Sequence, residues 1–176
     1  MQQEKWDEAI KAFRAAAEKD PEMSEAWYGI GVAENMKNGG SCEAAYKPLK
    51  RCVDLDPNHA RAHCLLGGVL LHVRKDAARA EKHFRATIRL EPNYALPHRG
   101  LSFILERRDD LDGAIREMLD YTRKGDPGGD GKATVAELRA KKAGLAAKPN
   151  AEAKARSPSR RARATAACDL VRLDPF

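Results

Sequence analysis

The histidine and cysteine side chains are the first candidates for chemistry in this sequence. His59, His63 and Cys64 lie close together, and two histidines spaced i, i+4 on a helix can bind zinc. No further ligand follows at a zinc-binding spacing, and there is no H-E-x-x-H motif. The cysteines are irregularly spaced and include no C-x-x-C pair: Cys42, Cys52, Cys64 and Cys168. This pattern predicts reduced thiols and no metal site.

Catalytic groups are not arranged in a pattern that we can assign to a reaction. The sequence has no glycine-rich phosphate loop after a strand, and no Ser/His/Asp or Cys/His combination with the signature of a catalytic triad. We therefore expect no enzymatic activity and no cofactor. Binding is then the leading class of function.

The segment 126–137 follows the spacing of a calcium-binding loop in part. Aspartate occupies loop positions 1 and 5, glycine position 6, threonine position 9 and glutamate position 12. Position 3, which normally supplies a ligand, is Gly128, and position 8 is the small Ala133. Calcium binding at this loop is therefore a minor alternative to a turn that leads into a terminal helix.

The elements that position these residues are predicted to be helices. Alanine occurs 30 times, whereas valine and isoleucine together occur 11 times, and alanine favours helices over strands. The longest uncharged apolar run, residues 64–71, is far shorter than the roughly 20 residues of a membrane span. The polar N-terminus does not look like a signal peptide. We expect an all-α, intracellular protein, in the cytoplasm or alternatively in the nucleus, without a membrane partner.

Three sequence markers recur with a period of about 35 residues. An acidic residue followed by proline ends a helix at 20–21, 56–57, 91–92 and 126–127. Before each pair, an alanine precedes a large apolar residue by four positions: Ala9 and Phe13, Ala45 and Leu49, Ala80 and Phe84, Ala114 and Met118. Earlier in each unit an apolar residue precedes a small one: Ile30 and Gly31, Leu66 and Gly67, Leu101 and Ser102. The small residues predict close contacts between two helices of a hairpin.

These markers resemble the tetratricopeptide repeat (TPR) family, whose 34-residue unit has the pattern W-x2-L-G-x2-Y, A-x3-F and P. The resemblance implies an α-solenoid of TPR-type helix-turn-helix hairpins over residues 1–127, in which each repeat contacts its neighbours. The expected array has a half repeat and three full repeats: 3–23, 24–59, 60–94 and 95–127. It also implies a non-catalytic scaffold or adaptor for protein-protein interaction.

Two features depart from a regular array. Pro48 falls in the second turn of a helix expected to start near Cys42, where it removes a backbone hydrogen bond and bends the helix. Segment 3–19 matches only the second helix of a repeat, so we expect an uncovered apolar face of Trp6, Ile10, Phe13 and Ala17. Self-association through this face and continuation in a longer array are the two alternatives.

In the TPR family, the first helices of successive repeats line a concave groove that holds a peptide or helix of a partner. By position, the resemblance places apolar side chains at the centre of this groove and cations around them. The ligand it implies is a protein or peptide with acidic residues. The expected groove residues are Tyr28, Val32, Asn35, Arg61, Leu65, His72, Leu96, Arg99, Phe103 and Arg107.

The residues after the array change in character. Segment 128–147 is predicted to be a capping helix, with a capping box at Thr134 and Glu137 and with Val135, Leu138 and Leu145 facing the last hairpin. Segment 148–176 is predicted to be disordered, because it has few large apolar residues.

Segment 148–176 also holds seven Lys or Arg against three Asp or Glu, a net charge of +4. Its arginine cluster surrounds Ser157 and Ser159, whose phosphorylation would weaken attraction to an anionic partner. Nucleic-acid binding or targeting through this basic tail is the alternative function.

Overall fold

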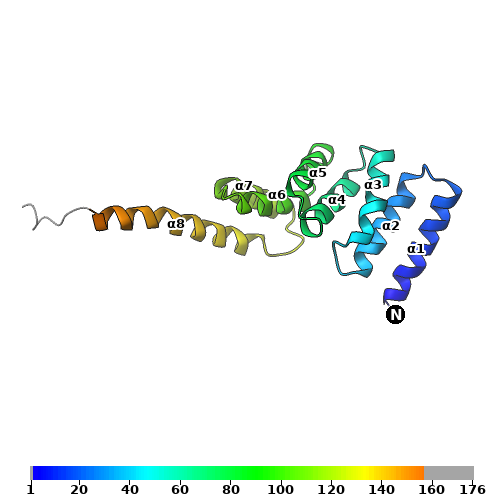
Figure 1. The fold of residues 1–176 in the computed structure, drawn as a ribbon, viewed down its shortest axis with the longest axis horizontal. Helices are drawn as coiled ribbons and strands as arrows, with labels where there is room; N and C mark the ends of the chain where they lie inside the picture. Colours follow the sequence, from blue (N-terminus) through cyan, green and yellow to red (C-terminus); the bar gives the residue numbers. More distant parts are fainter. Residues whose placement is uncertain (1, 157–176) are drawn as a thin grey trace, which may run out of the picture. The chain divides into compact units, whose positions relative to one another are not determined.

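The computed structural model describes the backbone of residues 2–156 and the side chains of residues 3–145. It separates into two compact units, Met1–Leu138 and Arg139–Phe176. The described residues form helices and no strand, so the all-α prediction is confirmed. In order along the chain (Figure 1), the elements are α1 (Gln2–Lys19), α2 (Ser24–Lys37), the 3₁₀ helix η1 (Glu43–Ala45), α3 (Tyr46–Leu55), α4 (Ala60–His72), α5 (Ala77–Leu90), α6 (Leu96–Arg107), α7 (Leu111–Arg123) and α8 (Gly131–Arg156).

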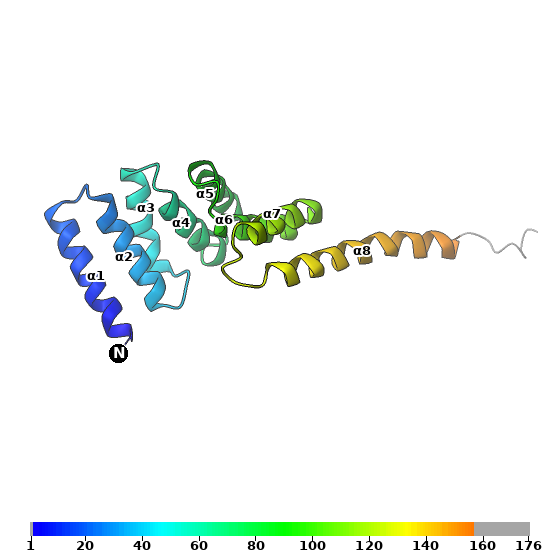
Figure 2. The ribbon, with the colours of Figure 1, turned by 180° about the vertical axis from the view of Figure 1, so that it is seen from behind.

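Helices α1 to α7 form a solenoid of helical hairpins, as the sequence predicts. Each helix packs against the next, most extensively in the pairs α1–α2, α4–α5 and α6–α7. Figures 1 and 2 show α1 to α5 side by side in chain order from two opposite directions. Helices α1, α3 and α5 each end directly before one of the predicted proline pairs.

Close contacts inside the hairpins explain the repeated small residues. A Cβ atom on Gly31 would lie 2.6 Å from the side chain of Leu49, and one on Gly67 would lie 2.8 Å from that of Phe84. In the third hairpin, the Ser102 hydroxyl donates a hydrogen bond of 2.8 Å to the carbonyl oxygen of Ala114. These positions exclude a larger side chain, as predicted.

The apolar core runs along the array as separate clusters. The central cluster joins α3, α4, α5 and α6 and includes Leu49, Leu70, Phe84 and Ile104. A second cluster joins the end of the array to the start of α8 through Met118, Tyr121, Val135 and Leu138. Separate clusters are expected in an array in which each repeat buries its apolar surface only against its neighbours.

Pro48 lies near the start of α3 and not in the second turn of a longer helix. The segment begins as the short 3₁₀ helix η1 and continues as α3 from Tyr46, so that Pro48 lies in the first turn of α3. The first amide groups of an α-helix have no intrahelical partner, so the missing N–H of proline breaks no bond there. The expected irregularity of this hairpin is therefore a late start of α3, which has 10 residues.

The start of α8 differs from the predicted cap. The helix begins at Gly131, and the Thr134 hydroxyl donates to the carbonyl oxygen of Asp130 from within the helix, so a capping box at Thr134 is wrong. Val135 and Leu138 are buried as expected, but Leu145 is 46% exposed. Only the first two turns of α8 therefore contribute to the core cluster.

The sequence predicts disorder from residue 148, whereas α8 continues to Arg156. Alanine is the best helix former, and it occupies positions 146, 147, 151, 153 and 155. This local preference favours a helix even though the segment has few large apolar residues. Residues 157–176 lie outside the described residues.

Candidate functional site

One exposed stripe of α6 carries four of the predicted groove residues. Leu96, Arg99, Phe103 and Arg107 are spaced three or four positions apart, which places them on one face of the helix. Leu96 is 37% exposed and Phe103 is 41% exposed. Large apolar side chains exposed beside cations form a surface suited to a partner.

His72 extends this stripe onto α4. Its ring centroid lies 5.7 Å from that of Phe103, and the guanidinium carbon of Arg107 lies 5.8 Å from the Phe103 ring centroid. Burial lowers the pKa of His72, and the nearby charges of Lys75 and Arg99 lower it further. The imidazole is therefore neutral at pH 7 and acts as an aromatic neighbour of Phe103.

A cavity of about 440 Å³ lies between α4, α6 and the start of α8, and we call it the α6 groove. It brings together four of the predicted residues: His72, Leu96, Arg99 and Phe103. It also includes Asp130 and Thr134 from the segment that leads into α8, which were not predicted as groove residues. The turn after α7 therefore closes one end of the groove.

Arg99 is held in position by this turn. Its Nη2 atom donates to Asp130 Oδ2 at 2.8 Å, and its guanidinium carbon lies 6.0 Å from the ring centroid of Tyr121. The Arg99 side chain is still 52% exposed. A guanidinium that is oriented by one carboxylate and open to solvent can bind a second carboxylate with little loss of side-chain entropy.

A second cavity of about 440 Å³ lies between α1 and α2, and we call it the N-terminal cavity. It contains the predicted groove residues Tyr28 and Val32, together with Trp6, Phe13 and Met23. The predicted groove is therefore divided between two cavities. Burial raises the pKa of Tyr28, so its hydroxyl stays protonated at neutral pH.

The predicted apolar face of α1 is only partly uncovered. Ile10 and Ala17 are each 5% exposed, whereas Phe13 is 38% exposed and Trp6 is half-buried. Ala17 packs in a core cluster with Ala26 of α2. The open face is thus formed by Trp6 and Phe13, and self-association through it stays a prediction.

Four predicted groove residues line neither cavity: Arg107 on the α6 stripe, and Asn35, Arg61 and Leu65. Asn35 is 4% exposed, and its Oδ1 accepts a hydrogen bond of 3.3 Å from the backbone N–H of Cys42, so its side chain contributes little open surface to a groove. The chain folds back over the end of α2 and buries this amide. Leu65 is half-buried against the central core cluster, and Arg61 is exposed.

A polar network that the sequence analysis missed joins α6 to α7. His98 is 4% exposed, with Nδ1 2.8 Å from Glu117 Oε2 and Nε2 2.7 Å from Lys124 Nζ. A lysine ammonium only donates, so Nε2 accepts and Nδ1–H donates to Glu117. Among the described residues, His98, Glu117 and Asp120 are close enough to hold a metal ion, but both His98 nitrogens are engaged in this network.

The calcium-loop carboxylates have separate structural roles. Asp126 accepts hydrogen bonds of 3.2 and 3.3 Å from the N–H of Gly131, which orders the turn before α8. Asp130 pairs with Arg99, and Glu137 lies exposed on α8. Among the described residues, Asp126, Asp130 and Glu137 are not grouped closely enough to hold a metal ion, so calcium binding here has no support from this geometry.

A partly buried pair of histidines predicts a pH dependence of stability. His63 Nδ1 lies 2.8 Å from His83 Nδ1, and burial, together with the charge of His63 and of Arg79, lowers the pKa of His83 to about 4. An unfolded histidine has a pKa of about 6.5. Above this pH both states are neutral and stability is unaffected; as pH falls from 6.5 toward 4, the unfolded state binds more protons and stability is lost.

We expect the free energy of unfolding to fall by at most about 1.4 kcal/mol per pH unit through this histidine, and by less because the ring is partly solvent-screened. Urea denaturation at pH 7.5, 6 and 5 measures the slope. In His83→Gln the part of the slope due to this side chain should disappear. Equal slopes for both proteins would show that His83 does not titrate as described.

The sequence also led to predictions about nucleic-acid binding and about membrane spans. Ser157, Ser159 and the rest of the basic tail from residue 157 onward lie outside the described residues, so the nucleic-acid alternative stays a prediction. Within residues 2–156, no helix is long and apolar enough to cross a membrane.

Comparison with known proteins identifies the repeat. A family model of the tetratricopeptide repeat matches residues 1–45. A comparison with the sequences of curated proteins finds no match. The rest of the chain is related to known folds through its similarity to solved structures.

Solved structures share this fold over most of the chain. MamA matches with a TM-score of 0.68 and 22% identity over 78% of this chain and 79% of its own. YrrB, described as a TPR protein with an unusual peptide-binding site, matches with a TM-score of 0.65 and 18% identity over 79% of this chain and 70% of its own. A mutant O-GlcNAc transferase from Thermobaculum terrenum matches with a TM-score of 0.56 and 27% identity, over 65% of this chain and 22% of its own.

The fold and its repeated contacts define an α-solenoid with exposed groove surfaces. The tetratricopeptide repeat that the sequence markers predicted is confirmed by the family model over residues 1–45, and the solved structures share the fold over most of the chain.

Proposed function

We propose that this protein is an interaction scaffold whose α6 groove binds a peptide segment of a partner. The observation that carries the proposal is Phe103, which is 41% exposed at the edge of a cavity of about 440 Å³. The His72 ring and the Arg107 guanidinium both lie close to its ring. An exposed, oriented aromatic side chain in a concave site is a typical anchor for a peptide.

Charge supports a ligand with acidic residues. Arg99 and Arg107 lie on the same stripe of α6 as Phe103, and both are exposed. Carboxylates of a peptide would pair with these guanidinium groups while an apolar side chain contacts Phe103 and Leu96. The apolar contact then contributes most of the affinity, and the arginines set the register and raise the association rate.

The fold comparison supports the ligand class. YrrB, which shares the fold, is described as having a peptide-binding site. The position of that site is not carried over to this chain. The assignment to the α6 groove rests on the exposure and neighbours of Phe103 in this structure.

The test is affinity capture with the full chain and with Phe103→Glu, followed by quantitative mass spectrometry. The substitution puts a negative charge on the apolar surface of the α6 groove. We expect specific partners to be depleted at least about tenfold, because loss of a central aromatic anchor typically costs more than 1 kcal/mol of binding energy.

Met36→Glu is the matched control, since Met36 is 53% exposed on α2 and lines neither cavity of the predicted groove. It adds the same charge to an apolar surface position. Partners that persist with Phe103→Glu, or that are lost equally in the Met36 control, would contradict the proposal. Circular dichroism of all three proteins excludes unfolding as the cause.

A further inference from the structure

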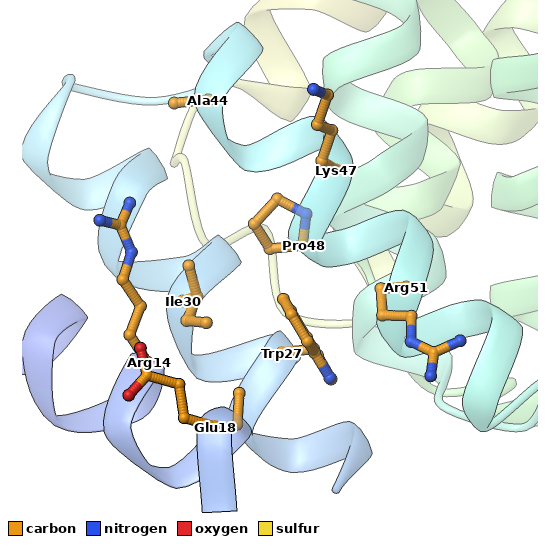
Figure 3. Close-up of a pocket in the computed structure, with 9 residues that line it drawn as sticks. Arg14, Glu18, Trp27, Ile30, Ala44, Lys47, Pro48 and Arg51 are labelled. Atoms are coloured by element: carbon orange, nitrogen blue, oxygen red, sulfur yellow. The ribbon is translucent and has the colours of Figure 1, made fainter. Parts of the chain in front are cut away.

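A third cavity, of about 620 Å³, lies between α1 and α3 and is larger than either groove cavity. We call it the outer cavity (Figure 3). Its floor is formed by Trp27 and Ile30 of α2, and Pro48 of α3 closes one side. None of its residues belongs to the predicted groove.

The outer cavity lies on the opposite face of α2 from the N-terminal cavity. Trp27 and Ile30 point about 150° away from Tyr28 and Val32, at about 100° per residue around the helix axis. A ligand in one cavity therefore does not contact the other. Binding to the outer cavity would be a separate property of the array.

Small side chains keep the outer cavity open. Ala17 and Ala44 line its edges, and the compact ring of Pro48 occupies a position where most helical residues would place a longer side chain. Trp27 is fixed in place, because its indole N–H donates a hydrogen bond of 2.9 Å to the Pro21 carbonyl oxygen. The cavity thus has a rigid aromatic floor, which favours a large apolar side chain as its occupant.

Cations dominate the rim of this cavity. Lys47 and Arg51 lie four residues apart on the exposed edge of α3, and Arg14 of α1 lies on the opposite side of the cavity. Arg14 contacts Glu34 Oε1 at 3.3 Å, but within the described part of the chain neither Lys47 nor Arg51 forms an ion pair. Glu18 is the single acidic side chain of the lining.

We propose that the outer cavity is a second docking site, for an acidic peptide segment of another protein. The peptide places a large apolar residue against Trp27, and its flanking carboxylates pair with Lys47 and Arg51. The carboxylate of Glu18 lies on the rim and repels a uniformly anionic polymer. This arrangement favours an alternating acidic and apolar peptide over a nucleic acid.

The test begins with a random peptide library displayed on phage and selected on the full chain. Selection is repeated on Lys47→Glu plus Arg51→Glu, and on the matched control Lys82→Glu plus Arg89→Glu. The control reverses the charge of two exposed side chains of α5, far along the chain from the cavity. We expect the library to yield peptides with a large apolar residue between acidic residues, which bind the control but lose at least tenfold affinity for the cavity variant.

Intrinsic fluorescence then locates the site. The chain has 2 tryptophans, and the Trp6→Phe variant leaves Trp27 as its single reporter. The selected peptides should change this emission and should still bind Phe103→Glu, which separates this site from the α6 groove. Failure to select such peptides, retained binding by the cavity variant, loss of binding in Phe103→Glu, or preferential binding of a random single-stranded RNA would each overturn the proposal.

Discussion

Replacing Phe84 with alanine should lower the free energy of unfolding by about 3–5 kcal/mol, the usual cost of removing a buried phenylalanine. Phe84 is 4% exposed and packs between two consecutive hairpins. Its ring lies where a Cβ atom on Gly67 of α4 or on Gly100 of α6 would stand, at 2.8 and 2.5 Å. Its removal leaves a cavity that neither glycine can fill.

The loss is large compared with the stability of a typical domain, about 5–15 kcal/mol. In a repeat array, stability is a sum of repeat and neighbour-interface contributions, and Phe84 belongs to two such interfaces. Urea denaturation followed by far-UV circular dichroism measures the change. Phe84→Ala should also unfold over a broader range of urea concentration, since the two halves of the array become less coupled.

Phe103→Ala is the matched control for this measurement. Both residues are phenylalanines on adjacent helices, but Phe103 is 41% exposed and lies in the α6 groove. We expect its removal to change stability by less than about 1 kcal/mol. If the two variants were equally stable, the Phe84 ring would not be needed to fill the space between the two hairpins.

The role of Phe84 could be predicted because its partners recur along the sequence. The four-residue spacing from Ala80 to Phe84 places both on the inner face of one helix, and Gly67 marks the facing helix. Contacts of this kind depend on local spacing, which a single sequence displays. The second contact, with Gly100, was missed because it joins two repeats, and the markers describe one repeat at a time.

The candidate site was less predictable because it depends on the connecting turns. Asn35 occupies a groove position on α2, but its amide binds the backbone of Cys42 in an atypically long turn. Arg99 is oriented by Asp130, which lies after the last repeat. Positions on a helix face can be derived from periodicity, whereas the course of a turn over that face cannot.

The outer cavity also could not be predicted from the sequence. It exists because Ala17, Ala44 and Pro48 are small or compact where they line the space between α1 and α3 beside α2. None of these residues is unusual by itself, and Pro48 was interpreted only as a source of helix distortion. A cavity between helices that are not sequential neighbours becomes visible only when the packing distances are known.

Tyr121 is the residue on which the end of the array depends most, and Tyr121→Ala should cost about 3–5 kcal/mol. Its side chain is fully buried in the cluster that includes Met118, Val135 and Leu138. Its hydroxyl also accepts a hydrogen bond of 2.7 Å from the backbone N–H of Gly128. The side chain therefore holds the turn as well as the core.

Tyr121→Phe separates these two contributions. It keeps the ring and removes the hydroxyl, and we expect a cost of only about 1 kcal/mol because water can reach the N–H of the exposed Gly128. Equal losses in Tyr121→Phe and Tyr121→Ala would mean that the hydrogen bond, and not the packing, dominates. Urea denaturation of both variants decides between these outcomes.

Tyr121→Ala should also weaken binding in the α6 groove, because the turn that Tyr121 holds contains Asp130. Asp130 orients Arg99 from this turn, so loosening the turn in Tyr121→Ala should release Arg99 without changing any groove side chain. Amide hydrogen exchange should increase in residues 125–131, while the amides of α2 and α4 keep their protection. Affinity for an acidic peptide bound in the α6 groove should then fall, whereas binding to the outer cavity at the other end of the array should be unchanged.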